Sequence, residues 1–129
     1  MKKYLLDTQV IINFWKGKKV WVDFISKHSN SVGTSVVCIA ELYEGIFLGQ
    51  RPREEREKIE EFIASLAFVA EIDRKTAEKF GELRAKLRKK GKVIADFDIL
   101  IAAASIKDNF ILVTENKKHF SRISELRIY

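Results

Sequence analysis

Hydrophobic and polar positions follow one another along the chain in blocks that predict short strands separated by helices. The apolar run from Tyr4 to Leu6 ends at Asp7, a pattern typical of a buried strand followed by a turn. Further strands are predicted at 30–34, 67–72 and 110–113, with a last edge strand at 126–129. Apolar residues at helical spacing predict helices over 10–15, 20–25, 36–48, 52–65, 74–91 and 96–106.

The alternation of strands and helices predicts the fold class. Successive parallel strands need crossover connections, so we expect an α/β fold with a mostly parallel sheet covered by helices on both faces. This is a three-layer α/β/α sandwich, and the length favours one domain over residues 1–129. Sites in such sheets lie at the carboxyl ends of strands. Asp7 occupies that place after the first strand, and Thr114 to Asn116 after a later one.

Composition excludes several classes of protein. The longest apolar run, from Ile99 to Ala104, has six residues, far short of the ~20 that a membrane-spanning helix needs. The apolar stretch after Lys3 is too short for a signal-peptide core. A single cysteine, Cys38, excludes an internal disulfide and a cysteine-rich zinc site. We therefore expect a cytoplasmic protein.

Positive charge is concentrated in one segment. The net charge is +6, and residues 74–92 alone carry nine Lys and Arg against two Glu. Such a segment fits the phosphate backbone of a nucleic acid, and it fits a solvated helix face equally well. The candidate phosphate contacts are Arg84, Lys86, Arg88, Lys89, Lys90 and Lys92.

Four carboxylates lie among apolar residues, where solvation does not explain them: Asp7, Glu41, Asp96 and Asp98. Burying a lone carboxylate costs several kcal/mol unless it is protonated, hydrogen-bonded or bound to a cation. Asp7 and Asp96 suit helix N-caps, and Glu41 suits a partner for Lys or Arg. If the four converge, a divalent cation relieves their repulsion, and oxygen-only ligands favour Mg²⁺ or Mn²⁺. The sequence has no phosphate-binding glycine loop and no nucleophile elbow.

Four motifs in order resemble those of the PIN-domain family. Residues 5–11 (LLDTQVI) resemble the opening LLDTNVLI, and 35–42 (SVVCIAEL) with Gly45 resemble the S-x-x-T-x-x-E-L…G helix. Residues 98–103 (DILIAA) resemble the DxLIAA helix, and 112–116 (LVTEN) with Phe120 resemble LVTxN…F. The motifs span essentially the whole chain. Within the family, the chain looks most like VapC-type toxins of toxin–antitoxin pairs.

The resemblance implies a ribonuclease that hydrolyses RNA with a metal-activated water. Asp7, Glu41 and Asp98 are the implied catalytic residues and ligands of Mg²⁺ or Mn²⁺. Asn116 is the implied fourth position, which many relatives fill with Asp, and Asp96 is a candidate for the missing carboxylate. The implied supporting hydroxyls are those of Thr8 and Thr114. The chain departs from the family at Gln9, where Asn is usual, and at Cys38, where Thr is usual.

The resemblance also implies a homodimer that is inhibited by a small VapB-type antitoxin. The aromatic residues Phe14, Trp15, Trp21 and Phe24 are candidates for contact with it, although such a stripe is more often part of a core. Two other functions stay open at this point. One is a PIN fold that binds RNA without cleaving it. The other is a receiver-like phosphoacceptor domain, which fits poorly because it needs an acidic pair where this chain has Asp7 followed by Thr8.

Overall fold

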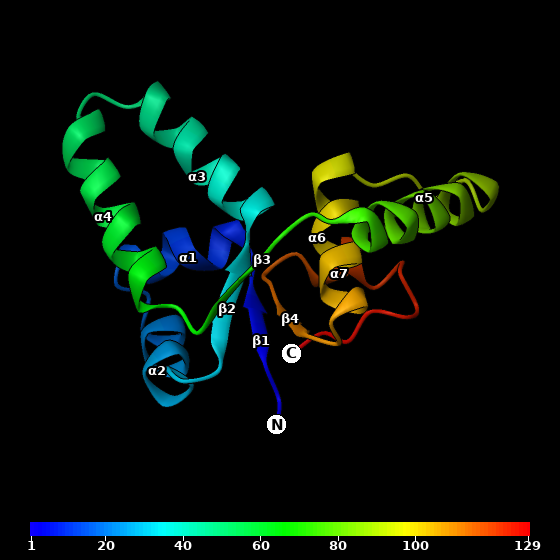
Figure 1. Ribbon diagram of the computed structural model, residues 1–129, viewed down its shortest axis with the longest axis horizontal. Coiled ribbons are helices and arrows are strands. Elements are labelled where there is room, and N and C mark those ends of the chain that lie inside the picture. The colour runs from blue at the N-terminus through cyan, green and yellow to red at the C-terminus, as the bar shows by residue number, and fades with distance from the viewer.

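Four short parallel strands form the centre of the protein in a computed structural model that describes all residues from Met1 to Tyr129 (Figure 1). They are β1 (Tyr4–Leu6), β2 (Val32–Ser35), β3 (Phe68–Ala70) and β4 (Ile111–Val113), in the spatial order β3-β2-β1-β4. Tyr4 pairs with Val32 on one side and with Ile111 on the other. β1 therefore lies beside β4, the strand farthest from it in the sequence.

Helices cover both faces of this sheet, which confirms the predicted three-layer α/β/α arrangement. Figure 1 shows α1 (Thr8–Trp15), α2 (Lys19–Lys27), α3 (Val36–Leu48) and α4 (Pro52–Ser65) on one side of the strands. It shows α5 (Arg74–Lys89), α6 (Asp96–Lys107) and the short α7 (Lys117–Phe120) on the other side. No helix has the length and apolar character that crossing a bilayer would require.

The hydrophobic core is divided by the sheet into two clusters. Successive side chains of a strand point to opposite faces, so Leu5 packs with α5 and α6 while Tyr4 and Leu6 pack with α1 to α4. Helix α6 is buried almost all round, and its alanines let it lie close to the sheet and to α5. A helix that is apolar on nearly all sides belongs inside a core. The half-buried Asp98 lies in the first turn of this helix, just before its buried residues.

The helix termini follow the sequence with one exception. Asp7, Ser35 and Asp73 each cap a helix with a side-chain oxygen, as the sequence predicts. The interpretation of Asp96 as an N-cap is wrong, because Ala95 holds that position and Asp96 is the first residue of the helix. The Asp96 carboxylate instead pairs with Arg84.

The segment after β4 differs from the prediction in two elements. The predicted edge strand at 126–129 is reduced to one bridge, in which Ile128 pairs with Leu112 of β4. Helix α7 was not predicted, because its four residues are too few to show a hydrophobic period. Both segments follow β4 and fold back against the α5–α6 side of the sheet (Figure 1).

Candidate active site

The buried carboxylate of Asp7 lies at the point where β1 and β4 end side by side. The Thr114 hydroxyl, just after β4, donates to Asp7 Oδ2 at 2.7 Å, and the Thr8 backbone N–H donates to Oδ1 at 2.9 Å. From β1 the chain proceeds to β2 on one side, while β4 occupies the other, so this is the switch point of the sheet. Ligands of open α/β sheets bind at such a switch point.

Glu41 reaches the same edge of the sheet from the middle of α3. The Thr8 hydroxyl donates to Glu41 Oε1 at 2.6 Å, which joins a carboxylate of α3 to the first turn of α1. Thr8 therefore contacts two of the predicted site carboxylates, Asp7 through its backbone and Glu41 through its side chain. Both predicted supporting hydroxyls, those of Thr8 and Thr114, thus donate to site carboxylates, and their part in a reaction stays a prediction.

Asp98 in the first turn of α6 is the third carboxylate of the group. Burial raises its pKa above the ordinary value, and the charges of Asp7 and Glu41 raise it further. Burial likewise raises the pKa of Asp7, although the bonds from Thr114 and Thr8 oppose this. Three carboxyls, from the N-cap of α1, from α3 and from α6, thus gather so that Asp7 and Glu41 repel Asp98, and the sequence predicts all three.

These residues have the chemistry of a site for a hard divalent cation. The donors are carboxylate oxygens. A bound cation would offset the burial that raises the pKa values of Asp7 and Asp98, and the repulsion that Asp7 and Glu41 exert on Asp98. As the side chains stand, no group of three or more His, Cys, Asp or Glu residues is close enough together to hold a metal ion. The argument that these residues suit a divalent cation therefore rests on the kind of donor atoms they offer and not on their present arrangement.

The two candidates for the fourth metal position have different surroundings. The backbone N–H of Asn116 donates to Thr114 Oγ1 at 2.9 Å, and Asn116 Nδ2 lies 2.9 Å from His119 Nδ1. Asp96, by contrast, accepts a bond of 2.8 Å from Arg84 Nε. His119 also lowers the pKa of Asp98, a role that the sequence analysis missed. The spacing of three residues between Asn116 and His119 accounts for their contact, but no local spacing connects His119 with Asp98.

Glu115 was missed by the sequence analysis as well. Its carboxylate accepts hydrogen bonds from three side chains of α1, of α2 and of the N-cap of α2: Asn13 Nδ2 at 3.0 Å, Trp21 Nε1 at 2.5 Å and Lys18 Nζ at 2.9 Å. The bond from Trp21 and the one from Lys18 lower the pKa of Glu115 to about 2. Because Glu115 follows Thr114 directly, these bonds tie the strand end that holds Asp7 to the helices beside it.

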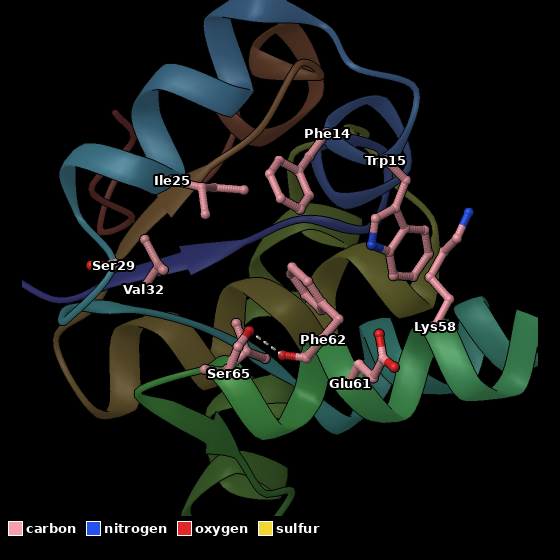
Figure 2. A pocket seen from close by; sticks show the side chains of 10 residues that line it. Phe14, Trp15, Ile25, Ser29, Val32, Lys58, Glu61, Phe62 and Ser65 are labelled. Atoms are coloured by element: carbon pink, nitrogen blue, oxygen red, sulfur yellow. Dashed lines mark hydrogen bonds between the residues drawn. The ribbon is translucent and has the colours of Figure 1, made fainter.

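The four aromatic candidates for partner contact divide into two pairs. Trp21 and Phe24 are 7% and 6% exposed and belong to the core, so they offer no surface to a partner. Phe14 and Trp15 are half-buried and line an open hollow of about 390 Å³. Figure 2 shows their rings beside that of Phe62, and the centroids of both rings lie within 5.8 Å of the Phe62 centroid.

The six basic residues that are candidates for phosphate contact fall into two groups, those with ion pairs and those without. Arg84 pairs with Asp96, and Lys86 pairs with Glu82 and Glu125. The other four have no ion pair and are exposed at the end of α5: Arg88, Lys89, Lys90 and Lys92. Arg88 lines a small surface cavity together with Asp96, two residues before Asp98. The free cations therefore lie beside the start of the helix that carries a site carboxylate.

Comparison with known proteins agrees with this fold. A sequence profile of the PIN domain matches residues 4–126. The chain therefore belongs to the PIN-domain family, and the receiver-like interpretation is wrong. Ribonuclease VapC2 of Haemophilus influenzae is 34% identical over 130 residues, which cover 98% of this chain and 96% of that protein.

Two further relatives give the same result. The tRNA(fMet)-specific endonuclease VapC of Shigella flexneri is 30% identical over 128 residues, covering 98% of this chain and 96% of that protein. The crystal structure of DNA-bound VapBC from Salmonella typhimurium matches with a TM-score of 0.92 and 27% identity, covering 100% of this chain and 98% of that chain. The protein is thus a nuclease of the VapC group.

The bonds at Glu115 lead to a prediction about stability and its pH dependence. Glu115→Gln should lower the free energy of unfolding at pH 7 by roughly 1–3 kcal/mol, since it removes the charge from three hydrogen bonds. The pKa of Glu115 falls from 4.5 to about 2 in the fold, so this stabilisation is present above pH 4.5 and is lost as the pH falls toward 2.

Urea unfolding at pH 7 and at pH 3 measures both effects. Glu57→Gln, a change at an exposed glutamate of α4 without an ion pair, is the matched control. The gap between the Glu115→Gln variant and the wild type should shrink at the lower pH. An equal loss for Glu57→Gln and Glu115→Gln would show that the bonds to Glu115 contribute nothing.

Proposed function

We propose that the protein is a divalent-metal-dependent endoribonuclease that acts in the cytoplasm as the toxin of a type II toxin–antitoxin pair. The observation that carries this proposal is the group of Asp7, Glu41 and Asp98 at the switch point of the sheet, with the pKa values of Asp7 and Asp98 raised. In a fold that only binds RNA, a group of carboxylates that repel one another would serve no purpose. The three acids thus favour catalysis over the non-catalytic alternative.

Each site residue has a distinct part in the proposed reaction. Asp7, held by Thr114 and Thr8, and Glu41, held by Thr8, present oxygens of fixed orientation to Mg²⁺ or Mn²⁺. Asp98 adds the third carboxylate. When bound, the ion supplies Lewis-acid activation of the phosphate and of a water.

A fourth oxygen is proposed to come from Asn116. The contact of Asn116 Nδ2 with His119 leaves Oδ1 as the atom that can turn toward the ion. Asp96 remains an alternative only if it exchanges its ion pair with Arg84 for the metal. We therefore favour Asn116 over Asp96.

The proposed substrate is RNA, and structured RNA such as tRNA in particular. The Shigella flexneri relative is named as a tRNA(fMet)-specific endonuclease, which supports this class of substrate. The exposed cations at the end of α5 suit phosphate contacts, which position an RNA without reading its sequence. Arg84 and Lys86 contribute less, because acidic neighbours already neutralise them.

The proposed partners are a VapB-type antitoxin and a second copy of the chain. The solved Salmonella typhimurium relative is a VapBC complex, which supports the antitoxin. We place its contact at the hollow of Phe14, Trp15 and Phe62 shown in Figure 2, since this apolar surface suits the face of an amphipathic helix. The exposed side chains of Val93, before α6, and of Phe97, in its first turn, provide apolar surface for the homodimer.

The proposed activity predicts metal-dependent cleavage that needs Asp98. End-labelled cellular RNA should be cut with Mg²⁺ or Mn²⁺ and left intact with EDTA. Asp98→Asn should lower the rate by roughly 10²-fold or more, because the variant keeps the shape of the site but loses a charge. Gel mapping of cleavage products measures both, and Asp23→Asn on the exposed face of α2 is the control. Cutting that survives EDTA would contradict the proposal.

A stability measurement shows whether the Asp98→Asn variant is folded. The raised pKa of Asp98 means that its charged form destabilises the fold, so wild-type stability decreases as pH rises through the titration of this carboxyl. Without metal, Asp98→Asn should therefore have a higher Tm than the wild type at pH 7 and an equal one in acid. Added Mn²⁺ should raise the Tm of the wild type more than that of the variant.

The free cations at the end of α5 predict a specific change in salt dependence. Replacing Arg88, Lys89 and Lys90 by alanine should weaken RNA binding and flatten the slope of log affinity against log salt by about 0.7 per lost contact. The double variant Lys2→Ala, Lys3→Ala is the control, since these lysines precede β1 and therefore lie at the amino end of this strand, opposite the end at which Asp7 lies. Filter binding across a salt series measures the slopes. Equal slopes for both variants would show that these residues of α5 do not contact RNA.

The placement of the antitoxin predicts a loss of binding when the hollow is damaged. Phe14→Ala should weaken the complex with the cognate antitoxin by roughly 2 kcal/mol, which is typical of a buried aromatic contact. Phe47→Ala is the control, because Phe47 is 69% exposed on α3 and does not line the hollow. Calorimetric titration compares the two. Undiminished affinity of the Phe14→Ala variant would place the antitoxin elsewhere.

A further inference from the structure

A second cavity, of about 300 Å³, lies between α1, α3 and α4 and adjoins the acid site. Its apolar wall consists of Ile12, Trp15, Leu42, Ile46 and Ile59. Three helices contribute to this wall, α1, α3 and α4, which lie on the same side of the sheet (Figure 1). Its volume is at the lower end of the range for small-ligand sites, which suits one flat ring system.

The cavity and the acid site share one residue, Glu41. Glu41 lines the cavity, and its carboxylate accepts the hydrogen bond from Thr8, which also contacts Asp7. Gly45 lines the same cavity one helical turn farther along α3, which is roughly 6 Å. A molecule whose reacting group lies at Asp7 and Glu41 can therefore place a neighbouring part of itself in the cavity.

Charged groups complete the lining of the cavity. Lys16 at the end of α1 and Lys58 of α4 supply two cations, and Lys58 Nζ lies 5.8 Å from the centre of the Trp15 ring. Glu55 adds an acceptor from α4. An apolar interior with cations and hydrogen-bond acceptors around it is complementary to a nucleotide, which combines a flat ring, N–H donors and a phosphate.

Gly45 indicates that the cavity is kept open for a ligand. A glycine inside a helix lowers stability relative to alanine, so it needs a reason. Packing does not supply one, because a Cβ added at Gly45 would meet no atom within 4 Å. A larger side chain at this position would project into the cavity and take up the space that a ligand needs.

We propose that this cavity binds the base of the nucleotide next to the bond that is cut. The proposal rests on the proposed function, since it takes the acid site as the place where RNA is cleaved. Unpaired RNA bases are recognised when they leave the stack and enter apolar, aromatic-lined pockets. The antitoxin is assigned to the neighbouring hollow of Phe14, Trp15 and Phe62, which shares Trp15 and Lys58 with this cavity.

The first test uses the four ribonucleoside 5′-monophosphates as probes, so no cleavage is involved. The chain has two tryptophans, and a ¹H–¹⁵N spectrum resolves their indole signals. At least one nucleotide should shift the signal of Trp15, which lines the cavity, and not that of Trp21, which is bonded to Glu115. Trp15→Phe identifies the signals. Ribose 5-phosphate, which has no base, should cause no such shift, and an equal shift would overturn the proposal.

The second test fills the cavity. Gly45→Leu should weaken nucleotide binding and raise the KM for RNA cleavage by roughly five- to hundredfold, the range expected for loss of one base contact. Gly81→Leu is the matched control, because Gly81 is a helical glycine of α5 that also has no atom within 4 Å of an added Cβ. Should Gly45→Leu fail to fold, Lys16→Glu at an exposed position serves instead and should weaken nucleotide binding several-fold.

The outcomes separate this proposal from its alternatives. A wild-type protein that binds nucleotides but cuts no RNA would overturn the proposed function, and with it the place of the base beside a cut bond, while nucleotide binding in the cavity would stand. Absence of nucleotide binding at millimolar concentration would overturn the base site. It would also be overturned if Gly45→Leu left RNA cleavage unchanged but abolished inhibition by the antitoxin, since the cavity would then belong to a protein partner.

Discussion

The arrangement of the protein depends on a carboxylate that is buried where two strands end. Asp7 is only 8% exposed, and burial raises its pKa, so the fold must supply compensating bonds. The Thr114 hydroxyl and the Thr8 N–H supply them, and Thr114 can do so only because β4 lies directly beside β1. The strand order, the position of the site and the capping of α1 therefore all depend on the bonds that this buried carboxylate needs.

The other acids extend that constraint into the two helical layers. Glu41 reaches the site from α3 on one face of the sheet, and Asp98 reaches it from α6 on the other. Their mutual repulsion opposes folding, and His119 offsets it at Asp98 only in part, since the pKa of Asp98 stays raised. Such an incompletely compensated cost is expected at a functional site and not in a structural core. The PIN-domain match and the VapC relatives agree with this interpretation.

The neighbourhood of α1 connects the site to its surroundings on two sides. Glu115 ties the end of β4 to Asn13 of α1 and Trp21 of α2, which holds Thr114 in place. On its other side, α1 carries Trp15, which lines both the hollow assigned to the antitoxin and the cavity assigned to a base. Inhibitor and substrate would then meet on adjacent surfaces, so that occupation of one can affect the other.

The pattern of apolar and polar residues predicted the layers, the three central acids and every helix and strand except α7, while the edge strand expected at 126–129 is a single bridge. Periodicity showed which residues face a core, and Glu41 and Asp98 were found because each lies among apolar neighbours. Only the tertiary structure revealed that Asp96 pairs with Arg84, that Glu115 bonds to Trp21, and that α1, α3 and α4 enclose a cavity. Local spacing records the environment of a residue but not its partner, and Glu115 and Trp21 are 94 residues apart. Contacts of that kind exist only once the strands and helices are packed.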